Sequence, residues 1–239
     1  MVVDHHTGRL VWAHAGRNRQ TVEKFLDLLG NARCQQIQLV SCDNAAWITG
    51  PIAERCPNAV ICLDPWHIVK AATDALDEVR RAVWNEARRS GNLAHAKQLK
   101  GARFALWKKP EKLTERQQQK LAWIAKLNAP IYRPYLLKEQ LRQIYHLPYT
   151  DALALLENWL KWARRCRLEP FVKLAKTITE QRSRVEAALK EQLSNARVEQ
   201  VNTQIRLITR RGFGYHSANA VIALAMLTLS GLCPALPGR

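Results

Sequence analysis

The chain has 239 residues and carries 37 Lys and Arg residues against 20 Asp and Glu residues, a formal net charge of +17. Because 47% of the residues are hydrophobic and 24% are charged, the composition excludes a disordered chain and predicts a packed globular fold. The excess of positive charge favours nucleic acid as the partner, although ribosomal and membrane-surface proteins share it.

The N-terminal segment predicts a β-hairpin followed by a helix. Two apolar, β-prone runs flank the stretch from Asp4 to Gly8, where glycine can take a positive φ. Apolar residues then recur with helical spacing from Thr21 to Leu29, and Gly30 ends the pattern. The order is therefore strand, strand, helix.

Two short apolar runs, residues 36–42 and 59–63, predict buried parallel strands with a small helix between them. Asp43 follows the first run and Asp64 follows the second. Functional groups of open α/β sheets collect at the carboxyl ends of strands, so these two carboxylates are the first chemical signal.

From residue 68 to residue 193 the sequence is amphipathic and basic without strand alternation, which predicts helices throughout. Thr114 and Gln117 resemble a capping box, and Thr150 is expected to cap another helix. Pro130 and Pro170 are expected to begin helices.

The last part predicts one amphipathic helix that Asn195 can cap and that Gly212 and Gly214 end. Its apolar face carries Val198, Val201, Ile205 and Ile208, and its opposite face carries Glu199, Asn202 and Arg206. The uncharged stretch from Ser217 to Leu236 is interrupted by Ser, Asn, Thr and Pro, so we expect no membrane span.

The six cysteines form no C-x-x-C pair and no disulfide framework, so we expect small core residues in a reduced cytoplasm. They are Cys34, Cys42, Cys56, Cys62, Cys166 and Cys233.

Two Asp residues at strand ends and a distant helical Glu are the ingredients of a site for Mg²⁺ or Mn²⁺, because hard cations prefer carboxylate oxygen. Asp64 and His67 are three residues apart across a strand-to-helix corner and can lie on the same side. The alternative is that Asp64 caps the helix while His67 packs inside its first turn.

The motifs in their order resemble the ISL3 family of bacterial insertion-sequence transposases from end to end. They are VVDHHTGRLVW, LVSCDNAAW, CPNAVICLDPWHIVKAATDALDEVRR, RFALWKKPEKLTERQQQKL, LNAPIYRPYLLKEQLRQIYH and SNARVEQVNTQIRLITRRGFGYHS. The Asp-x-x-His corner and the Asn-x-x-x-Glu-x-x-Asn helix followed by Arg-Arg-Gly-Phe-Gly are among the blocks that match in order.

The resemblance implies an α/β fold in which a large all-helical insertion interrupts an RNase H-like core. Residues 1–67 would form the strands and first helices, residues 68–193 the basic insertion, and residues 194–239 the helices that complete the core.

The resemblance also implies a DDE site that cleaves and joins DNA with Mg²⁺ or Mn²⁺. The second catalytic Asp falls on Asp43 and the catalytic Glu on Glu199, and both would bind metal. Four residues would support them: Asp64, His67, Asn195 and Asn202. Two metal ions held this way activate a nucleophile and stabilise the leaving oxygen of a phosphodiester.

The implied partners are transposon-end and target DNA, with a homo-oligomer in the synaptic complex, in the bacterial cytoplasm at the nucleoid. Nine basic residues are the candidates for DNA contact: Arg80, Arg81, Arg88, Arg89, Lys108, Lys109, Arg206, Arg210 and Arg211. Trp107 or Trp123 would stack on a distorted base, against the alternative of core packing.

In the family, the first catalytic Asp stands on an opening strand that precedes the hairpin with which this sequence starts. Asp4 matches the turn after the second strand, so no metal is assigned to it. We therefore expect an N-terminally truncated transposase, with a sheet that lacks its first strand and with no strand transfer on its own. The alternative is a non-catalytic derivative that binds DNA or inhibits assembly of a full-length relative.

Overall fold

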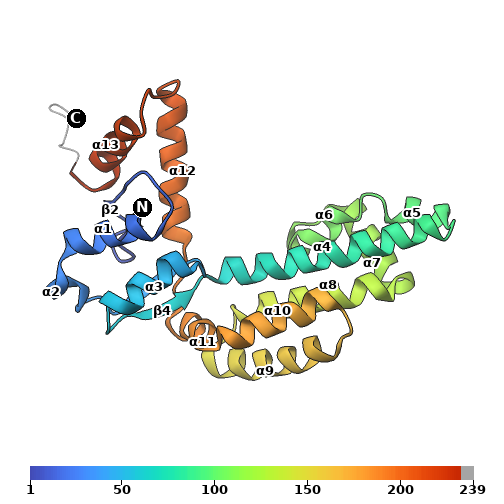
Figure 1. Ribbon diagram of the computed structural model, residues 1–239. Coiled ribbons are helices and arrows are strands. Elements are labelled where there is room, and N and C mark those ends of the chain that lie inside the picture. Colours follow the sequence, from blue (N-terminus) through green and yellow to red (C-terminus); the bar gives the residue numbers. More distant parts are fainter. Residues whose placement is uncertain (233–239) are drawn as a thin grey trace. The chain divides into compact units, whose positions relative to one another are not determined.

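A computed structural model describes residues 1–232, apart from the side chain of Ala129. The chain divides into two compact units (Figure 1). The first consists of Met1–Asp64 together with the chain from Leu193 onward, and the second of Pro65–Gln192.

The first unit begins with the expected hairpin. Strands β1 (Val2–Val3) and β2 (Leu10–Trp12) pair in antiparallel fashion. In the turn, the carboxylate of Asp4 accepts hydrogen bonds from the His6 amide at 2.9 Å and the Thr7 hydroxyl at 2.6 Å. Gly8 takes a φ of 72°, the left-handed conformation that favours glycine. The hairpin prediction is confirmed.

Helix α1 (Arg19–Leu29) confirms the next prediction and begins two residues before the expected start at Thr21. The side chain of Asn18 caps it by accepting from the Thr21 amide at 3.0 Å, and Gly30 ends it with a φ of 78°. A short helix that the sequence did not predict, α2 (Asn31–Cys34), follows directly.

The two apolar runs form β3 (Leu39–Cys42) and β4 (Val60–Leu63), which pair in parallel and are joined through α3 (Ala46–Arg55). The strands, their parallel pairing and the small helix between them are confirmed. The expected burial is wrong at the start of each strand, where Leu39 is 38% and Val60 is 47% exposed. Helices α1 and α3 pack together, and their buried residues share a core with the strands. This core contains Leu26, Cys34, Ile52 and Cys56, with Val40 and Ile61 packed against it.

The chain returns to the first unit as α12 (Ala196–Arg211) and α13 (Ala218–Leu229). Helix α12 packs on β1, and α13 packs on β2 and α12. Leu10, Val201 and Ala225 form the centre of this second core. The apolar face predicted for α12 is the inner one, since Val201 is 2% exposed while Glu199 and Arg206 are exposed.

The described strands pair two by two, as β1 with β2 and as β3 with β4. Residues of β1 and β3 line a common cavity of about 540 Å³, together with residues of α1, α3 and the start of α12. The α/β class is confirmed, and the membership of these strands in one RNase H-like sheet stays a prediction.

The second unit is helical. Its elements are α4 (Pro65–Arg89), α5 (Leu93–Leu99), α6 (Arg103–Trp107), the 3₁₀ helix η1 (Pro110–Lys112), α7 (Glu115–Leu127), α8 (Ala129–Ile144), α9 (Tyr149–Arg165), α10 (Glu169–Glu180) and α11 (Arg182–Glu191).

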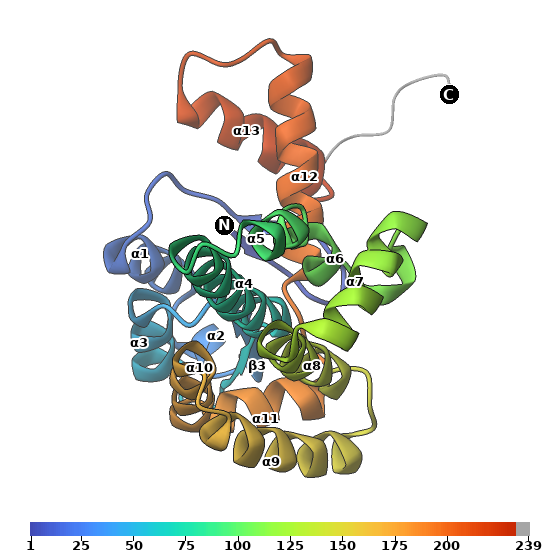
Figure 2. The same ribbon diagram turned by 90° about the vertical axis from the view of Figure 1, so that its right-hand side faces the viewer.

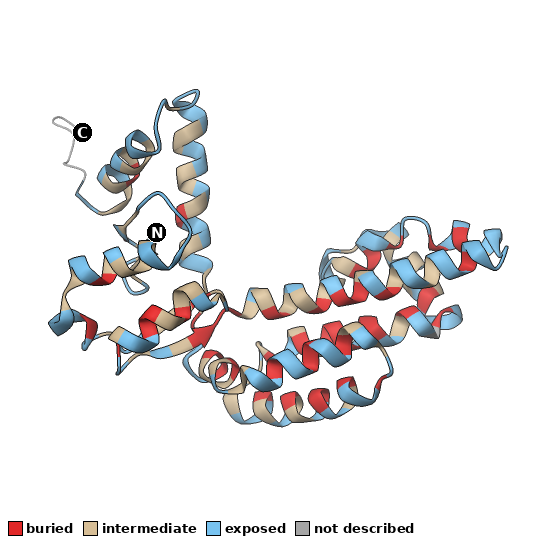
Figure 3. Cartoon of the chain, viewed as in Figure 1, coloured by how far each residue is buried: buried red, intermediate tan, exposed pale blue. Residues whose placement is uncertain are grey.

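Four of these helices close into a bundle, because α4 contacts α8, α8 contacts α9, α9 contacts α10, and α10 contacts α4. In Figure 2, α4 and α8 are seen nearly end on, and α9 runs across the view below them. Figure 3 shows buried stripes on these helices facing inward. Trp159 is completely buried there, and its indole N–H donates to the carbonyl of Leu137 at 2.8 Å. Burial of such apolar stripes is what drives a bundle to fold.

The helix starts of this unit test the predicted caps. Thr114 and Gln117 form the expected capping box at α7, and Pro130 and Pro170 lie in first turns of α8 and α10. The cap assigned to Thr150 is wrong, since α9 already begins at Tyr149 after Pro148. The fixed φ of proline prepares the chain to enter the helix before Thr150 is reached.

Five cysteines, Cys34, Cys42, Cys56, Cys62 and Cys166, are buried, as expected for core residues, and Cys233 lies outside the described residues. Burial is the main reason why the pKa of the Cys56 thiol is raised to about 11. Among residues 1–232, no helix is long and apolar enough to cross a membrane.

Candidate metal centre

The register of the parallel strands brings two carboxylates to one edge of the β3–β4 sheet. Cys42 pairs with Leu63, so Asp43 and Asp64 follow the strands at matching positions. The Asp64 amide donates to the carbonyl of Cys42 at 3.4 Å, which holds the two strand ends together. The sequence expectation that these residues share the carboxyl edge is met for both.

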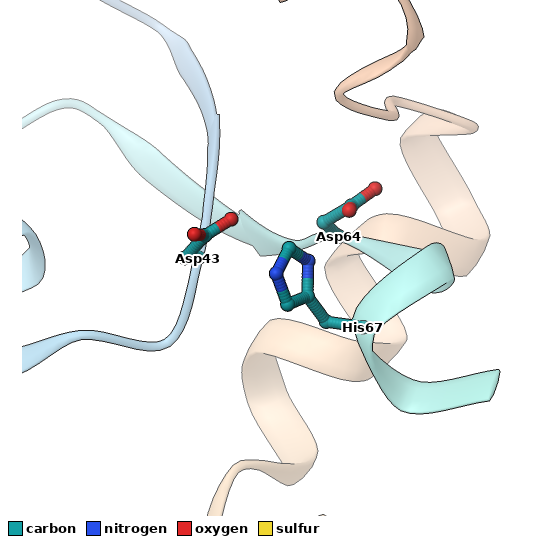
Figure 4. Close-up of side chains that lie close together, drawn as sticks. All are labelled: Asp43, Asp64 and His67. Carbon is teal, nitrogen blue, oxygen red and sulfur yellow. The ribbon is translucent and has the colours of Figure 1, made fainter. Parts of the chain in front are cut away.

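Asp43, Asp64 and His67 form a group whose candidate ligand atoms all lie within 4.8 Å of one another. His67 belongs to the first turn of α4, three residues along the chain from Asp64. Figure 4 shows its ring pointing toward the two carboxylates. Asp64 is only 2% exposed, and a buried carboxylate requires hydrogen bonds or cations around it.

Asn195 bonds to three parts of this edge. Its side-chain oxygen accepts from the Ser41 hydroxyl at 2.7 Å, and its side-chain N–H donates to the Asp43 carboxylate at 3.3 Å. Its backbone N–H donates to the Asp64 carboxylate at 3.2 Å. One residue therefore positions both carboxylates against the start of α12.

This use of Asn195 corrects a detail of the sequence analysis. The residue does occupy the N-cap position of α12, but its side chain makes no capping hydrogen bond to that helix. The amide is engaged with Ser41 and Asp43 instead. Ser41 was missed, although residues two apart on a strand share a face, so its spacing from Asp43 is the signal that could have found it.

The donor set fits a divalent cation that accepts oxygen ligands. Carboxylate oxygens suit Mg²⁺ and Mn²⁺, and an imidazole nitrogen suits a transition metal. Asp43 and Asp64 come from adjacent strand ends, which gives the site a rigid base.

Comparison with known proteins identifies the family. The family model of the ISL3 DDE transposases, described as "Transposase", matches residues 1–225. The chain belongs to the ISL3 family of transposases. The family named from the motif order is thereby confirmed.

Curated relatives of this transposase chain carry the same description. The transposases for insertion sequence element IS1557 from two strains of Mycobacterium tuberculosis, CDC 1551 and H37Rv, are each 49% identical over 258 aligned residues, which cover 100% of the chain and 58% of the relative. The transposase for insertion sequence element IS1001 from Bordetella parapertussis is 25% identical over 218 residues, covering 90% of the chain and 53% of the relative. The chain thus spans just over half the length of these transposases. No solved structure matches it.

The transposase residues expected on α12 stand one and two turns beyond Asn195. Glu199 is exposed in the first turn, and its amide donates to the Asn195 carbonyl at 3.0 Å. Asn202 is partly buried on the next turn. Within residues 1–232, neither is part of the Asp43–Asp64–His67 group.

The basic residues expected to contact DNA differ in their surroundings. Arg80 and Arg81 both pair with Asp77, at 2.8 and 3.3 Å, and Arg88 lies over the ring of Trp84 at 4.8 Å. Arg81 and Arg88 are nonetheless exposed, as are the remaining six candidates: Arg89, Lys108, Lys109, Arg206, Arg210 and Arg211.

The two tryptophans considered for base stacking are both partly buried. Arg103 covers the ring of Trp107, with its guanidinium carbon 3.8 Å from the ring centroid, and Lys120 lies 5.3 Å from the ring centroid of Trp123. Both rings are thus engaged with a cation of their own unit.

Proposed function

We propose that this chain is the catalytic region of a DDE transposase that cleaves DNA and joins transposon ends to target DNA with Mg²⁺ or Mn²⁺. The observation that carries the proposal is the group of Asp43, Asp64 and His67 within 4.8 Å at one sheet edge. Its support is the family membership of residues 1–225. When bound, the divalent ions would supply activation of the attacking oxygen and charge stabilisation of the leaving oxygen.

In this proposal Asp43 and Glu199 are the catalytic carboxylates, and an RNase H-like core presents them. Asp64 and His67 hold the strand-to-helix corner beside Asp43, and Asn195 fixes the carboxylates at the edge. Glu199 lies one helical turn beyond Asn195, and in this proposal α12 would bring it to the site. Asn202 follows on the next turn as a supporting residue.

Exposed arginines and lysines would hold DNA through its phosphates, in agreement with the net charge of +17. A homo-oligomer in a synaptic complex and a place at the bacterial nucleoid belong to the same proposal, because both follow from action on transposon ends.

Metal binding tests the site directly. We expect purified chain to bind Mn²⁺, measured by loss of the free-ion EPR signal, and Asp43→Asn or Asp64→Asn to weaken that binding at least about tenfold. Asp74→Asn is the matched control, since Asp74 pairs with Lys70 on the surface of α4. Equal Mn²⁺ affinity in all four proteins would contradict the proposed site.

Strand transfer tests the activity. The 239 residues supply Asp43 and Glu199 but no residue that the family resemblance places at the first catalytic Asp. We therefore expect these residues alone, with Mn²⁺, to bind transposon-end DNA without joining it, which is also how a non-catalytic derivative would behave. Robust joining that Asp43→Ala abolishes would show that the chain supplies the whole site.

A further inference from the structure

The loop that ends α12 contains a side chain that the site does not use. The helix closes with two backbone bonds: the Phe213 amide donates to the Arg210 carbonyl at 3.2 Å, and the Gly214 amide donates to the Thr209 carbonyl at 3.1 Å. This pair of bonds is the Schellman motif. The residue at its left-handed position is Phe213, with a φ of 52°.

Phe213 occupies this position at two costs. Glycine is the residue preferred there, because a Cβ is disfavoured in the left-handed region. The ring is also 100% exposed, so it gains nothing from burial. A glycine would serve the helix end better, which indicates that the ring has a role outside the fold.

The backbone on both sides of Phe213 is constrained. Tyr215 packs over Gly212, where an added Cβ would lie 2.5 Å from the tyrosine hydroxyl oxygen. Gly214 takes a φ of 101°. Tight packing on one side of Phe213 and a capped helix on the other fix the backbone from which the ring projects.

The charge around Phe213 favours a polyanion. Arg210 and Arg211 form the last turn of α12 and are exposed, and Arg206 lies exposed one turn earlier. The positive charge of Arg210 and Arg211 exceeds the partial negative charge, about half a unit, that a helix carries at its C-terminus. An exposed aromatic ring beside phosphate-binding arginines is the combination that stacks on nucleobases.

We propose that Phe213 stacks on an unpaired DNA base while Arg210 and Arg211 contact the flanking phosphates. This inference rests on the proposed action on DNA and adds a specific contact to it: the protein recognises a base that has left the duplex stack. The Trp residues considered from the sequence are replaced in this role by a phenylalanine in the loop that follows α12.

The experiment uses the full chain and two DNA probes of the same sequence, one fully paired duplex and one with a single unpaired 2-aminopurine. We expect Phe213→Gly to lower affinity for the unpaired probe about tenfold and to leave affinity for the paired duplex within about twofold. Phe213→Trp should retain the wild-type preference and quench the 2-aminopurine fluorescence on binding.

Stability separates a lost contact from a lost fold. Phe213→Gly relieves the left-handed strain, so it should unfold at the same temperature as the wild type or higher. Leu207→Ala is the matched control, because Leu207 is an exposed apolar residue of α12, 46% exposed, and should leave both affinities unchanged.

Each contrary outcome is distinguishable. If Phe213→Gly bound each probe with the same affinity as the wild type, the stacking contact would be overturned, while the proposed action on DNA would stand. An equal loss on both probes would overturn base recognition and assign the loop to backbone contact. If Phe213→Gly instead dissociated an oligomer with unchanged DNA affinity, the ring would contact a second copy and the inference would fail. Wild-type chain that binds neither probe would contradict the proposed function itself.

Discussion

Asn195 connects three segments that lie far apart in the sequence, and its hydrogen bonds decide where two carboxylates stand. Its side chain reaches Ser41 and Asp43, and its backbone reaches Asp64. Ser41 donates to the amide oxygen, which leaves the amide nitrogen to face Asp43. A residue that reads as a helix cap in the sequence is therefore a positioning residue for the proposed metal site.

The first prediction concerns Asn195→Ala. Removing the amide leaves Ser41 and Asp43 without these partners, which should cost about 1–2 kcal/mol of unfolding free energy. It should also lower Mn²⁺ affinity about tenfold or more, because outer partners orient ligands. Urea unfolding and Mn²⁺ titration measure the two effects.

Gln200→Ala, at an exposed position of the same helix, is the control for this substitution and should leave Mn²⁺ affinity unchanged. A loss of stability in Asn195→Ala with wild-type Mn²⁺ affinity would show that Asn195 serves the fold and not the metal site.

The second prediction concerns pH and Cys56, which is 2% exposed beside Cys34. Its pKa is raised from 9.0 to about 11 in the folded protein, chiefly by burial. The unfolded chain therefore releases this proton at lower pH than the folded chain, so the contribution to stability is complete below pH 9 and is lost as the pH rises toward 11.

Urea unfolding at pH 8, 9 and 10 should show a loss of stability that is smaller in Cys56→Ala than in the wild type. Cys166→Ala, a buried cysteine of the second unit, controls for the cavity that either substitution leaves. Identical pH slopes for the wild type and Cys56→Ala would contradict the assignment.

At the scale of elements, the sequence predicted the strands and helices whose pattern of apolar residues determines their secondary structure. The hairpin follows from β-prone runs around Gly8, and the parallel strands follow from apolar runs that end at Asp43 and Asp64. Helix α2 was missed because a four-residue helix is too short to show a period. The spacing of apolar residues within a segment predicts the secondary structure of that segment, so these elements could be predicted from the sequence.

The contacts that build the candidate site are long-range, which limits what the sequence can show. The proximity of Asp43 to Asp64 could be expected because parallel strands end at one edge. The hydrogen bond from Asn195 to Asp43 joins residues 152 positions apart, and no local pattern encodes it. The exposure and left-handed φ of Phe213 are likewise visible only in the folded loop.

The third prediction compares two threonines that look like helix caps in the sequence. Thr114 forms a capping box with Gln117 at the start of α7, whereas Thr150 lies inside the first turn of α9. Thr114→Ala should cost about 1 kcal/mol of stability. Thr150→Ala should be neutral or stabilise by about 0.5 kcal/mol, because alanine is the better helix former.

Chemical denaturation of both variants distinguishes the two threonines, and Thr150→Ala is the matched control for Thr114→Ala. Equal destabilisation by the two substitutions would mean that the capping box contributes nothing beyond the loss of a surface hydroxyl.

At the scale of the whole molecule, two units with separate cores share one chain. The first unit needs segments from both ends of the sequence, Met1–Asp64 and the chain from Leu193 onward, while the second is the continuous segment Pro65–Gln192. The helical unit is inserted in the sequence between the two Asp residues and Glu199. The proposed catalytic carboxylates Asp43 and Glu199 thus belong to the first unit, whereas the exposed Arg89, Lys108 and Lys109 belong to the second.

The last prediction is that residues 65–192 fold by themselves. The ring of α4, α8, α9 and α10 closes a core around Trp159, Phe171 and Leu137, all completely buried, so the segment has the apolar interior that an independent domain requires. We expect a helical circular dichroism spectrum, dispersed amide NMR signals and one cooperative urea transition with an unfolding free energy of about 5–10 kcal/mol.

The segment should also bind duplex DNA with an affinity that falls steeply with added salt, since Arg89, Lys108 and Lys109 are exposed on it. Poorly dispersed NMR signals would show that the bundle depends on the first unit for its fold. A folded segment that does not bind DNA at low salt would assign the DNA contacts to α12 and the loop that follows it.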